Sequence, residues 1–581
     1  MSEQLTTAAK SHREGRYVDA ERLYRDYLRA YPANTEVLLA LGHVCYQQGK
    51  LTESIACLEQ ACKVEPADPE LHFTLGNLIS EKGDDPERAL ACYRQAVILM
   101  PDYGVAWLHL GVAYYHAMNY SAAAESLSRA AVLDPRDEKT FYNLGLALMR
   151  SGRAAEAGQM LRRARDIAPN NSAIHTCLLF NLHHVAGLSN REIFDEHLRW
   201  AARFGAEYPG RTAAAQAPAR TRLRVGYISP DFRTHSVFYF IHPIVKEHDR
   251  ATIECYCYSD VTQPDDLTRK LMNEADHWRD ISGLDDDQAF RLIQQDGIDI
   301  LVDLAGHTDR NRLRMLSRKA APVQVSYLGY PDTTGLRTVD YRLTDEWADP
   351  EGVSDDYYTE KLVRLENGFL CYEPPVEPPF HRSVPARQNG FVTFGSYNNL
   401  AKINGDVILA WSDILRQLPG AKLLLKARGL GDPSVRATFL SEFRSHGIGA
   451  DRIECLGHMI DVDQHLDAYN RMDVALDTFP YNGTATTCEA LWMGVPVITF
   501  TGERHASRVG TSLLTSIGLT DCIAGGRESY IDLAVQLARD VDKLEGIRAG
   551  LRERMRSSPL MDAAKFCRTL ERKYRLFAMS E

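Results

Sequence analysis

The segment LDTFPYNGTATTCEALWMGVPVITF, residues 476–500, contains two short apolar runs separated by a polar turn and a helical stretch. The runs VALDTF (474–479) and VPVITF (495–500) have the composition of buried strands. Between them, residues 480–487 are rich in glycine and hydroxyl groups, and residues 488–493 are predicted to be helical. A strand, a turn, a helix and a second strand in this order predict a parallel sheet covered by helices.

The turn of this segment has the composition of an anion-binding site. A loop that enters a helix gathers unpaired backbone N–H groups at the positive end of the helix, where a diphosphate can bind. The candidate residues are Gly483, Thr484, Thr486 and Thr487, and Glu489 in the first helical turn could bind two ribose hydroxyls. Alternatively, Thr486 and Glu489 form a capping box that needs no ligand. The spacing leaves both interpretations open.

Strand–helix alternation extends on both sides of this segment, from residue 223 onward. The further predicted strands are LRVGYIS (223–229), IECYCYS (253–259), IDILVDLAG (298–306), VQVSYLG (323–329), FVTFGSYN (391–398), AKLLLKA (421–427) and RIECLG (452–457). A proline-rich break at 374–385 divides them into two similar halves. Two parallel sheets of this kind form a cleft lined by the carboxyl ends of their strands. A helical tail over 528–579 is long enough to brace both halves.

The first 170 residues have a different, periodic organisation. Prolines recur at 32, 66, 101, 135 and 169, in step with the Leu-Gly pairs at 41–42, 75–76, 110–111 and 144–145. A period of 34 residues with these marks predicts a superhelix of about five tetratricopeptide repeats. Such arrays hold an extended segment of another protein in a concave groove. Alternatively, the array serves only to hold copies of the chain together.

Composition narrows the class of protein. The chain has 581 residues, of which 45% are hydrophobic, and a formal net charge of −11, which disfavours a nucleic-acid-binding surface. The twelve cysteines have no disulfide or zinc spacing, as in proteins of a reducing compartment. Neither a secretion signal nor a membrane span is found, so a cytoplasmic protein is expected.

Two groups of polar residues are candidate metal ligands, but neither has the arrangement of a metal site. His183 and His184 lie in helical sequence (171–208) that bridges the array to a linker at 209–220, and adjacent helical positions point apart. They are interpreted as packing or surface residues without a third ligand nearby. The acidic run at 285–287 is interpreted as a helix cap. We therefore expect no metal cofactor.

Several loops that follow predicted strands carry candidate site residues. Lys402, in SYNNLAKI, could neutralise a leaving diphosphate, although it could equally be a solvated loop lysine. The loop TGERHASR (501–508) offers Arg504, His505 and Arg508, and His465 lies where it could stack near a base. In the first half, SPDFRTHSV carries Asp231 and His235, and LAGHTD carries Asp303 and His307.

The chain resembles the SPINDLY-type proteins and the related O-GlcNAc transferases, tetratricopeptide-bearing enzymes that glycosylate Ser and Thr of proteins. The blocks that carry the resemblance are SPDFRTHSV (229–237), DILVDLAGHT (299–308), APVQVSYLGYPDTTGL (321–336), VDYRLTDEWADP (339–350), FVTFGSYNNLAKI (391–403), LDTFPYNGTATTCEALWMGVP (476–496) and HASRVGTSLL (505–514). The resemblance implies a GT-B fold of two Rossmann-like lobes, metal-independent inversion at the sugar, and donor binding mostly in the second lobe. The expected domains are the array at 1–170, the bridge and linker at 171–220, and lobes at 221–385 and 386–581.

The resemblance also implies roles for individual residues. Lys402 matches the diphosphate-binding lysine of the family, and Asn399 stands in place of a glutamine of the O-GlcNAc transferases. Glu489 stands in place of their ribose-binding aspartate, His465 matches a base-stacking histidine, and His235 matches a histidine near the reacting sugar.

Two departures bear on the donor. Thr484 and Val462 replace a histidine and a lysine of the O-GlcNAc transferases, and the TATTCE and NNLAKI runs look more like SPINDLY, whose family activity is O-fucosylation from GDP-fucose. The expected donor is GDP-fucose or UDP-GlcNAc.

The expected reaction takes the proton of an acceptor hydroxyl to a base. His235 is the first candidate because imidazole titrates near neutral pH, with Asp303, His307 or the donor phosphate as alternatives. Two rival hypotheses remain: a transferase that uses another donor, such as a CMP-nonulosonic acid on flagellin, and a catalytically decayed repeat scaffold. The expected partners are acceptor proteins and a nucleotide sugar, with neither nucleic acid nor membrane; a homo-oligomer is compatible with the sequence.

Overall fold

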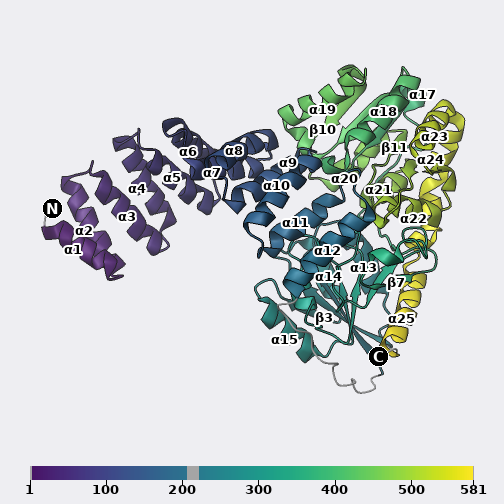
Figure 1. Ribbon diagram of the computed structural model, residues 1–581, viewed down its shortest axis with the longest axis horizontal. Helices are drawn as coiled ribbons and strands as arrows, with labels where there is room; N and C mark the ends of the chain where they lie inside the picture. Colours follow the sequence, from purple (N-terminus) through teal and green to yellow (C-terminus); the bar gives the residue numbers. More distant parts are fainter. Residues whose placement is uncertain (1–2, 206–220, 580–581) are drawn as a thin grey trace. The chain divides into compact units, whose positions relative to one another are not determined.

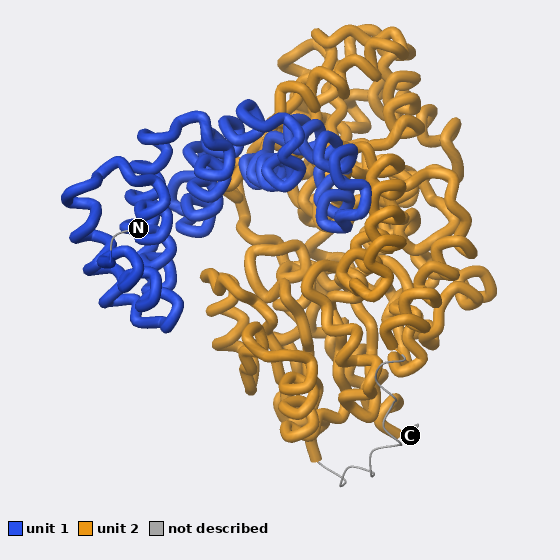
Figure 2. Tube along the Cα trace, turned by 60° about the vertical axis from the view of Figure 1, so that its left-hand side comes forward, with its two compact units in different colours: residues 1–148 blue, residues 149–581 orange. Residues whose placement is uncertain are grey.

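The computed structural model describes residues 3–205 and 221–579, so the predicted linker at 209–220 lies outside the described residues. The chain divides into two compact units, residues 1–148 and 149–581 (Figure 2). The sequence places the end of the array at residue 170. In the structure, the helix that follows Arg153 belongs to the second unit, within which it packs against the next helix along the chain.

The first unit is built from consecutive helices of 11–14 residues (Figure 1). They are α1 (Glu3–Arg13), α2 (Tyr17–Ala30), α3 (Thr35–Gln47), α4 (Leu51–Val64), α5 (Pro69–Lys82), α6 (Pro86–Leu99), α7 (Gly104–His116), α8 (Tyr120–Leu133) and the start of α9 (Glu138–Arg150). The glycines of three Leu-Gly pairs, Gly42, Gly76 and Gly111, let two helices approach closely: a Cβ atom on Gly111 would lie 2.5 Å from Leu127 Cγ. The predicted repeat array is therefore confirmed, with the Leu-Gly pairs at its helix crossings.

The second unit begins with the helices α10 (Ala154–Ile167), α11 (Ser172–Leu182) and α12 (Asn190–Phe204). A seven-stranded parallel sheet follows, in the order β3-β2-β1-β4-β5-β6-β7. Its strands are β1 (Leu223–Ser229), β2 (Ile253–Ser259), β3 (His277–Asp280), β4 (Ile300–Asp303), β5 (Val323–Ser326), β6 (Tyr341–Thr344) and β7 (Lys361–Arg364). The helices of this lobe are α13 (Phe238–Glu247), α14 (Asp266–Glu274), α15 (Asp286–Asp296) and α16 (Leu313–Leu316). Strands β3, β6 and β7 were not predicted.

The second lobe has a six-stranded parallel sheet in the order β10-β9-β8-β11-β12-β13. Its strands are β8 (Thr393–Ser396), β9 (Lys422–Lys426), β10 (Ile453–Leu456), β11 (Val474–Leu476), β12 (Val497–Phe500) and β13 (Ile523–Ala524). Its helices are α17 (Ala386–Asn389), α18 (Gly405–Gln417), α19 (Pro433–Ser445), α20 (Val462–Asp467), α21 (Ala485–Trp492) and α22 (Val509–Ser516). The predicted fold class, a repeat superhelix followed by two Rossmann-like lobes, is confirmed.

The C-terminal helices are α23 (Arg527–Arg539), α24 (Val541–Arg556) and α25 (Ala563–Met579). The first two pack on the second lobe, whereas α25 returns to the first lobe beside α13. There, the ring of Phe577 stacks on Tyr341 with 4.0 Å between ring centroids, and Glu571 accepts a 2.9 Å hydrogen bond from His248. The predicted bracing tail is thus confirmed. Within the described residues, every helix is too short or too polar to span a membrane.

Candidate functional site

Two loops of the second lobe meet at the carboxyl edge of its sheet. Strands β8 and β11 are parallel neighbours, so the loops that follow them leave the same edge. Lys402 lies in the 3-10 helix η3 (Leu400–Lys402) of the first loop, and its Nζ donates a 2.7 Å hydrogen bond to the main-chain oxygen of Asn482 in the second. The same ammonium lies 3.8 Å from the centroid of the Tyr481 ring. The lysine therefore lies on the predicted anion-binding turn and is not a solvated loop lysine.

Within residues 3–205 and 221–579, the charge of Lys402 has no fixed counter-ion. Burial lowers the pKa of its amine to about 8, while the carboxylate of Asp477 acts in the opposite direction. Among the described residues, the amine has a carbonyl and an aromatic face as neighbours but no carboxylate at ion-pair distance. A buried cation without a counter-ion is stabilised by a bound anion. This arrangement suits a phosphate-bearing ligand.

Asp477 holds the shape of the turn. Its Oδ1 accepts a 2.7 Å hydrogen bond from the Gly483 N–H, and its Oδ2 accepts one of 2.7 Å from the Thr499 hydroxyl. Burial raises the pKa of this carboxyl to about 6, against the hydrogen bond from Gly483. The sequence analysis expected the Gly483 amide to bind the anion. That expectation is wrong for the amide, because Asp477 already occupies it.

The remaining polar groups of the turn bind one another and a residue that the sequence analysis missed. The Thr486 hydroxyl donates a 3.1 Å hydrogen bond to Oδ1 of the buried Asn398, and the Thr487 hydroxyl donates one of 3.1 Å to the Gly483 oxygen. A Cβ atom on Gly483 would lie 2.5 Å from Thr486 Oγ1 and 2.9 Å from Asn398 Oδ1, so the turn requires glycine. Asn398, rather than the exposed Asn399, joins the two loops.

The capping-box alternative is wrong. Helix α21 begins at Ala485, three residues earlier than predicted, and its N-cap Thr484 makes no side-chain cap hydrogen bond. Glu489 therefore lies in the second turn of the helix rather than the first. The first backbone N–H groups of α21 have no acceptor within the helix, and they lie on the loop that carries the Lys402 contact.

Glu489 belongs to a network of polar side chains. Its Oε2 accepts hydrogen bonds of 2.9 Å from both His465 Nε2 and the Tyr469 hydroxyl. The Lys426 amine donates to the other ring nitrogen of His465, which fixes the ring as a donor toward Glu489. Burial raises the pKa of Glu489 to about 7 and lowers the pKa of Lys426 to about 8. Glu489 and His465 thus lie together, and Lys426 at the end of β9 is an addition to them.

The loop after β12 contains two predicted donor-binding residues that contact the first lobe. His505, 4% exposed, holds the carboxylate of Asp349 at 2.6 Å from its Nδ1. The Arg508 guanidinium donates to the main-chain oxygens of Trp347 (2.8 Å) and Gly502 (2.9 Å). Since Asp349 and Trp347 belong to the first lobe, these side chains join the two lobes. These contacts use His505 Nδ1 and two of the Arg508 nitrogens, and donor binding by either residue stays a prediction.

Of the three candidate bases, His235 is the accessible one. Its side chain is 41% exposed on the loop after β1, with Nδ1 at 3.6 Å from Asp231 Oδ2. Burial lowers the pKa of the imidazole, while Asp231 opposes that effect. A neutral imidazole at neutral pH is the form that accepts a proton.

Asp303 and His307 are enclosed and serve their own loop. Asp303, 2% exposed, accepts hydrogen bonds from the N–H groups of Ala305 (3.2 Å) and Gly306 (2.8 Å). His307 is fully buried, with Nε2 at 2.9 Å from the Thr334 oxygen. An acceptor hydroxyl has no access to either side chain, so their expected role as bases is wrong.

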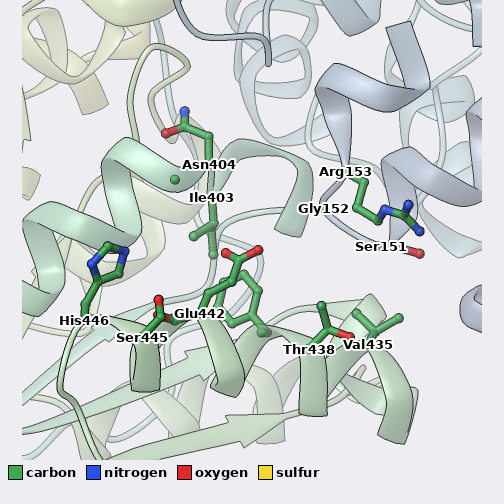
Figure 3. Close-up of a pocket in the computed structure, with 12 residues that line it drawn as sticks. Ser151, Gly152, Arg153, Ile403, Asn404, Val435, Thr438, Glu442, Ser445 and His446 are labelled. Carbon is green, nitrogen blue, oxygen red and sulfur yellow. The ribbon is translucent and has the colours of Figure 1, made fainter. Parts of the chain in front are cut away.

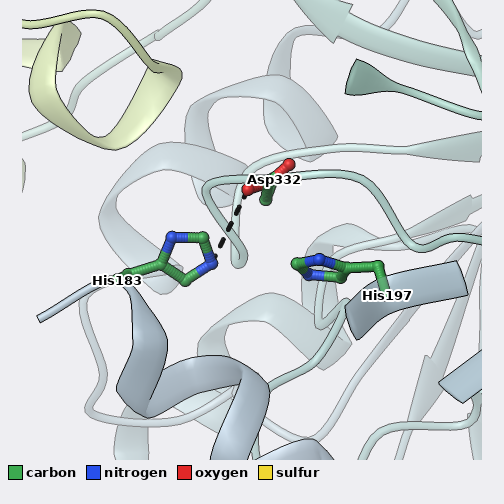
Figure 4. Close-up of side chains that lie close together, drawn as sticks. All are labelled: His183, His197 and Asp332. Atoms are coloured by element: carbon green, nitrogen blue, oxygen red, sulfur yellow. Dashed lines mark ion pairs between the residues drawn. The ribbon is translucent and has the colours of Figure 1, made fainter. Parts of the chain in front are cut away.

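The bridge helices carry a buried histidine cluster that the sequence did not reveal. The hydroxyl of Tyr330 lies 2.9 Å from His183 Nε2 and 2.8 Å from His197 Nε2. Figure 4 shows His183 and His197 with Asp332, whose Oδ2 lies 3.8 Å from His183 Nε2. The expectation that no third metal-ligating residue lies near His183 and His184 is therefore wrong. The side chains of His183, His197 and Asp332 could together hold a metal ion. However, the Tyr330 hydroxyl hydrogen-bonds both imidazoles. The geometry favours a hydrogen-bonded chain that joins the bridge to the first lobe.

The acidic run at residues 285–287 caps a helix, as predicted. Asp285 caps α15 in a capping box with Gln288. Arg312 and Arg318 pair with Asp286 and Asp287, respectively.

A cavity of about 260 Å³ lies behind the Lys402 loop (Figure 3). Its lining includes Ile403 and Asn404 from that loop, His446 at the end of α19, and Arg153 before α10. The Asn404 side chain caps α18 and donates to the Phe479 oxygen (2.7 Å), which supports the loop from this side. Lys402, Asn482 and Glu489 are not among the residues that line the cavity.

Comparison with known proteins places this geometry in a family. The family model described as glycosyl transferase family 41 matches residues 205–373 and 382–570, more than half of the chain. A model of the C-terminal domain of cilia and flagella-associated protein 70 matches residues 2–168, the helical array.

Individual relatives agree with the family model. The probable UDP-N-acetylglucosamine–peptide N-acetylglucosaminyltransferase SPINDLY of Solanum lycopersicum is 40% identical over 403 residues, and that of Arabidopsis thaliana is 39% identical over 395 residues. These matches cover 68% and 67% of this chain, but 43% of the length of each relative. A solved mutant of the Thermobaculum terrenum O-GlcNAc transferase superposes with a TM-score of 0.80 at 37% identity, over 88% of this chain and 97% of that one. The chain belongs to glycosyl transferase family 41.

Proposed function

We propose that the protein is an inverting glycosyltransferase that moves a sugar from a nucleotide sugar to Ser or Thr hydroxyls of proteins bound by the repeat array. The observation that carries this proposal is the position of Lys402 on the 480–487 turn. It is a cation without a fixed counter-ion, hydrogen-bonded at 2.7 Å to the loop that begins α21. Family membership supports the class of reaction.

The proposed chemistry depends on stabilising the departing diphosphate. The acceptor oxygen attacks the anomeric carbon while the bond from that carbon to the phosphate oxygen breaks, and the bonding electrons leave with the nucleoside diphosphate. Lys402 and the first N–H groups of α21 stabilise the charge that develops on the phosphate. A preorganised amine and helix terminus provide this stabilisation without a metal ion, and attack opposite the leaving group inverts the anomeric centre.

The nucleoside half of the donor is assigned to the Glu489 network. The Glu489 carboxylate accepts two hydrogen bonds within the protein, both on Oε2. Its other oxygen remains for the ribose hydroxyls, in line with the role that the family resemblance implies. Burial raises the pKa of this carboxyl to about 7. A ribose hydroxyl that donates a hydrogen bond to it stabilises the ionised form, so donor binding and ionisation of Glu489 favour each other.

His235 is the proposed base. It is exposed on the first lobe, and Asp231 orients its ring from 3.6 Å. The proton of the acceptor hydroxyl passes to its imidazole as the oxygen attacks, and it leaves later to solvent.

The residues around the diphosphate and the nucleobase bear on the identity of the donor. Thr484 and Val462 stand where O-GlcNAc transferases carry a histidine and a lysine, which favours GDP-fucose, whereas the names of the curated SPINDLY relatives include UDP-N-acetylglucosamine. The test is to incubate the protein separately with GDP-fucose, UDP-GlcNAc and a CMP-nonulosonic acid. Melting temperature and transfer to a Ser/Thr-rich acceptor protein are then measured.

A donor that binds only the folded state and is present at a concentration of 100 times its Kd stabilises that state by about 2.7 kcal/mol, which gives a readily measured shift of the melting temperature. We expect GDP-fucose or UDP-GlcNAc to give both the shift and the transfer. If the CMP-sugar alone does so, the donor class is wrong. If no nucleotide sugar shifts the melting temperature, the enzyme proposal fails and the chain is a repeat scaffold.

A further inference from the structure

Arg504, in the loop after β12, differs from the other cations of that loop. Its Nη1 is buried and has no hydrogen-bond partner within residues 3–205 and 221–579. The neighbouring Arg508, by contrast, donates to two main-chain oxygens. A buried guanidinium nitrogen without an acceptor is unfavourable, and it can donate a hydrogen bond to an anionic ligand.

The loop that carries Arg504 lies against the Lys402 site, because the main-chain oxygen of Ala506 accepts a 2.8 Å hydrogen bond from the Asn482 N–H, and the Asn482 oxygen accepts the Lys402 hydrogen bond. Burial, together with the positive charges of Lys402 and, more weakly, Arg504, lowers the pKa of His184 to about 3. The two cations therefore both act on the same imidazole. The His184 ring lies 5.1 Å from the Tyr481 ring, whose face carries the Lys402 ammonium at 3.8 Å. A continuous set of contacts thus leads from Lys402 through Tyr481 to His184, beside Arg504.

The nearest acid compensates Arg504 only in part. Asp332 lies close enough for the guanidinium to lower its pKa, but the two side chains form no ion pair among the described contacts. Burial dominates at Asp332 and raises the pKa of its carboxyl to about 7, so that part of the population is neutral at physiological pH. His183 and His184 contribute no negative charge. Asp332 and Glu503 both act on the charge of Arg504, but within the described residues neither Arg504 nor Lys402 forms an ion pair with a carboxylate.

We propose that Arg504 is a second anion-binding residue of this site and binds an anionic oxygen of the donor, on a phosphate or on a carboxylate of the sugar. The inference rests on the proposed function, which supplies the nucleotide sugar, and extends it to a residue outside the diphosphate turn. The planar guanidinium presents paired N–H donors that match both phosphate and carboxylate oxygens. With Lys402 it would hold the donor by two separated cations rather than one.

The test measures ligand affinity by titration calorimetry for the full chain and for Arg504→Gln, Arg504→Lys and Asp332→Asn. Arg416→Gln is the matched control, because Arg416 is a half-exposed arginine with one ion pair to Asp413. The ligands are a nucleoside, its diphosphate, a nucleotide sugar whose sugar is uncharged, and UDP-glucuronate, whose sugar carries a carboxylate. The nucleoside is guanosine or uridine, chosen to match the donor that the wild type accepts.

We expect Arg504→Gln to weaken binding of the anionic ligands at least tenfold and to leave nucleoside binding unchanged. Arg504→Lys should recover part of the loss. Asp332→Asn should tighten anion binding, because it removes a competing carboxylate. A loss already present with the diphosphate identifies the phosphate as the bound group, whereas a loss confined to UDP-glucuronate identifies the sugar carboxylate.

Equal affinities of Arg504→Gln and wild type for every anionic ligand would overturn the inference and leave the proposed function intact. An equal loss for the nucleoside, or weaker anion binding by Asp332→Asn, would show that Arg504 has a structural role only. Failure of the wild type to bind any nucleotide would refute the proposed function, and this inference with it.

Discussion

The Lys402 ammonium donates a 2.7 Å hydrogen bond to the main-chain oxygen of Asn482, eighty positions further along the chain. This bond joins the loops that follow two neighbouring strands of one parallel sheet. It fixes the amine beside the start of α21, where the helix dipole and the side-chain charge act on the same volume. The predictions below follow from this arrangement and from the contacts around it.

Replacement of Lys402 by methionine should abolish sugar transfer, with a loss of at least about 10³-fold in kcat/KM. The reason is that the amine stabilises charge that forms on the leaving phosphate, and removal of one such donor typically costs 10²–10³ or more. The measurement is a transfer assay with a labelled donor. Lys422→Met, at the exposed start of β9, is the control and should retain activity. A Lys402→Met enzyme with most of its turnover would refute the mechanism.

Binding of the nucleoside diphosphate should weaken as pH rises through about 8. The pKa of Lys402 is lowered to about 8, so the amine is charged below that pH and loses its charge above it. Affinity measured by calorimetry between pH 7 and 9.5 should therefore fall by up to tenfold per pH unit on the alkaline side. Because the pKa of Lys426 is also about 8, Lys426→Met is the control and should keep this decline. Lys402→Met should lose it.

Replacement of His235 by alanine should lower kcat by about 10²–10⁴ and leave the donor KM nearly unchanged. General-base catalysis contributes this range, and the loss falls on the chemical step rather than on donor binding. Steady-state kinetics with varied donor concentration measures both parameters. His446→Ala, in the cavity behind the Lys402 loop, is the control. A rise in donor KM with an unchanged kcat would make His235 a binding residue.

Replacement of Asp349 by alanine should destabilise the second unit by about 3–5 kcal/mol, because it leaves buried partners of the carboxylate without their acceptor. Asp349 is fully buried and accepts hydrogen bonds from His505 (2.6 Å) and Tyr358 (3.1 Å). Chemical denaturation measures the change. Asp413→Ala, at the partly exposed pair with Arg416, is the control and should cost much less.

The same carboxylate gives a pH dependence of stability. Its contacts, chiefly with His505, hold the pKa of Asp349 below its usual range despite burial. Its contribution to the free energy of unfolding is therefore present above pH 4 and should be lost as the pH falls below the unfolded-state value of about 3.9. A wild-type protein that loses no more stability than Asp349→Ala on acidification would contradict this assignment.

Short apolar runs revealed most strands but missed β3, β6, β7 and β13, and three of these have a clear physical reason. Strand β6 carries Arg342, which is buried and donates to the Tyr330 and Asp332 oxygens, so its sequence reads as polar. Strand β3 is half-exposed at the sheet edge, and β13 has two residues. Such strands are stabilised by pairing with a neighbour, which a single-sequence pattern does not report.

Candidate site residues were found where the residue type and the position after a strand both indicated chemistry. Lys402, Glu489, His465 and His235 met these conditions. The roles of Asp303 and His307 as bases were misassigned because the sequence does not show that both side chains are buried. The contacts of His505 and Arg508 were missed because their partners lie elsewhere in the chain: Asp349 lies 156 positions before His505. Asn398, Lys426 and Tyr481 were missed, although a polar or aromatic residue at a strand end is a weak sequence indication for each.

The amino-acid sequence by itself determined the repeat period, the two strand–helix halves and the loop types, because each depends on residues close together in the chain. Only the tertiary structure decided which polar groups are free to bind a ligand. Burial and distant partners set that availability: Asp477 accepts from the Gly483 amide, Asp349 contacts His505 Nδ1, and in the described part of the chain the Lys402 amine has no carboxylate at ion-pair distance.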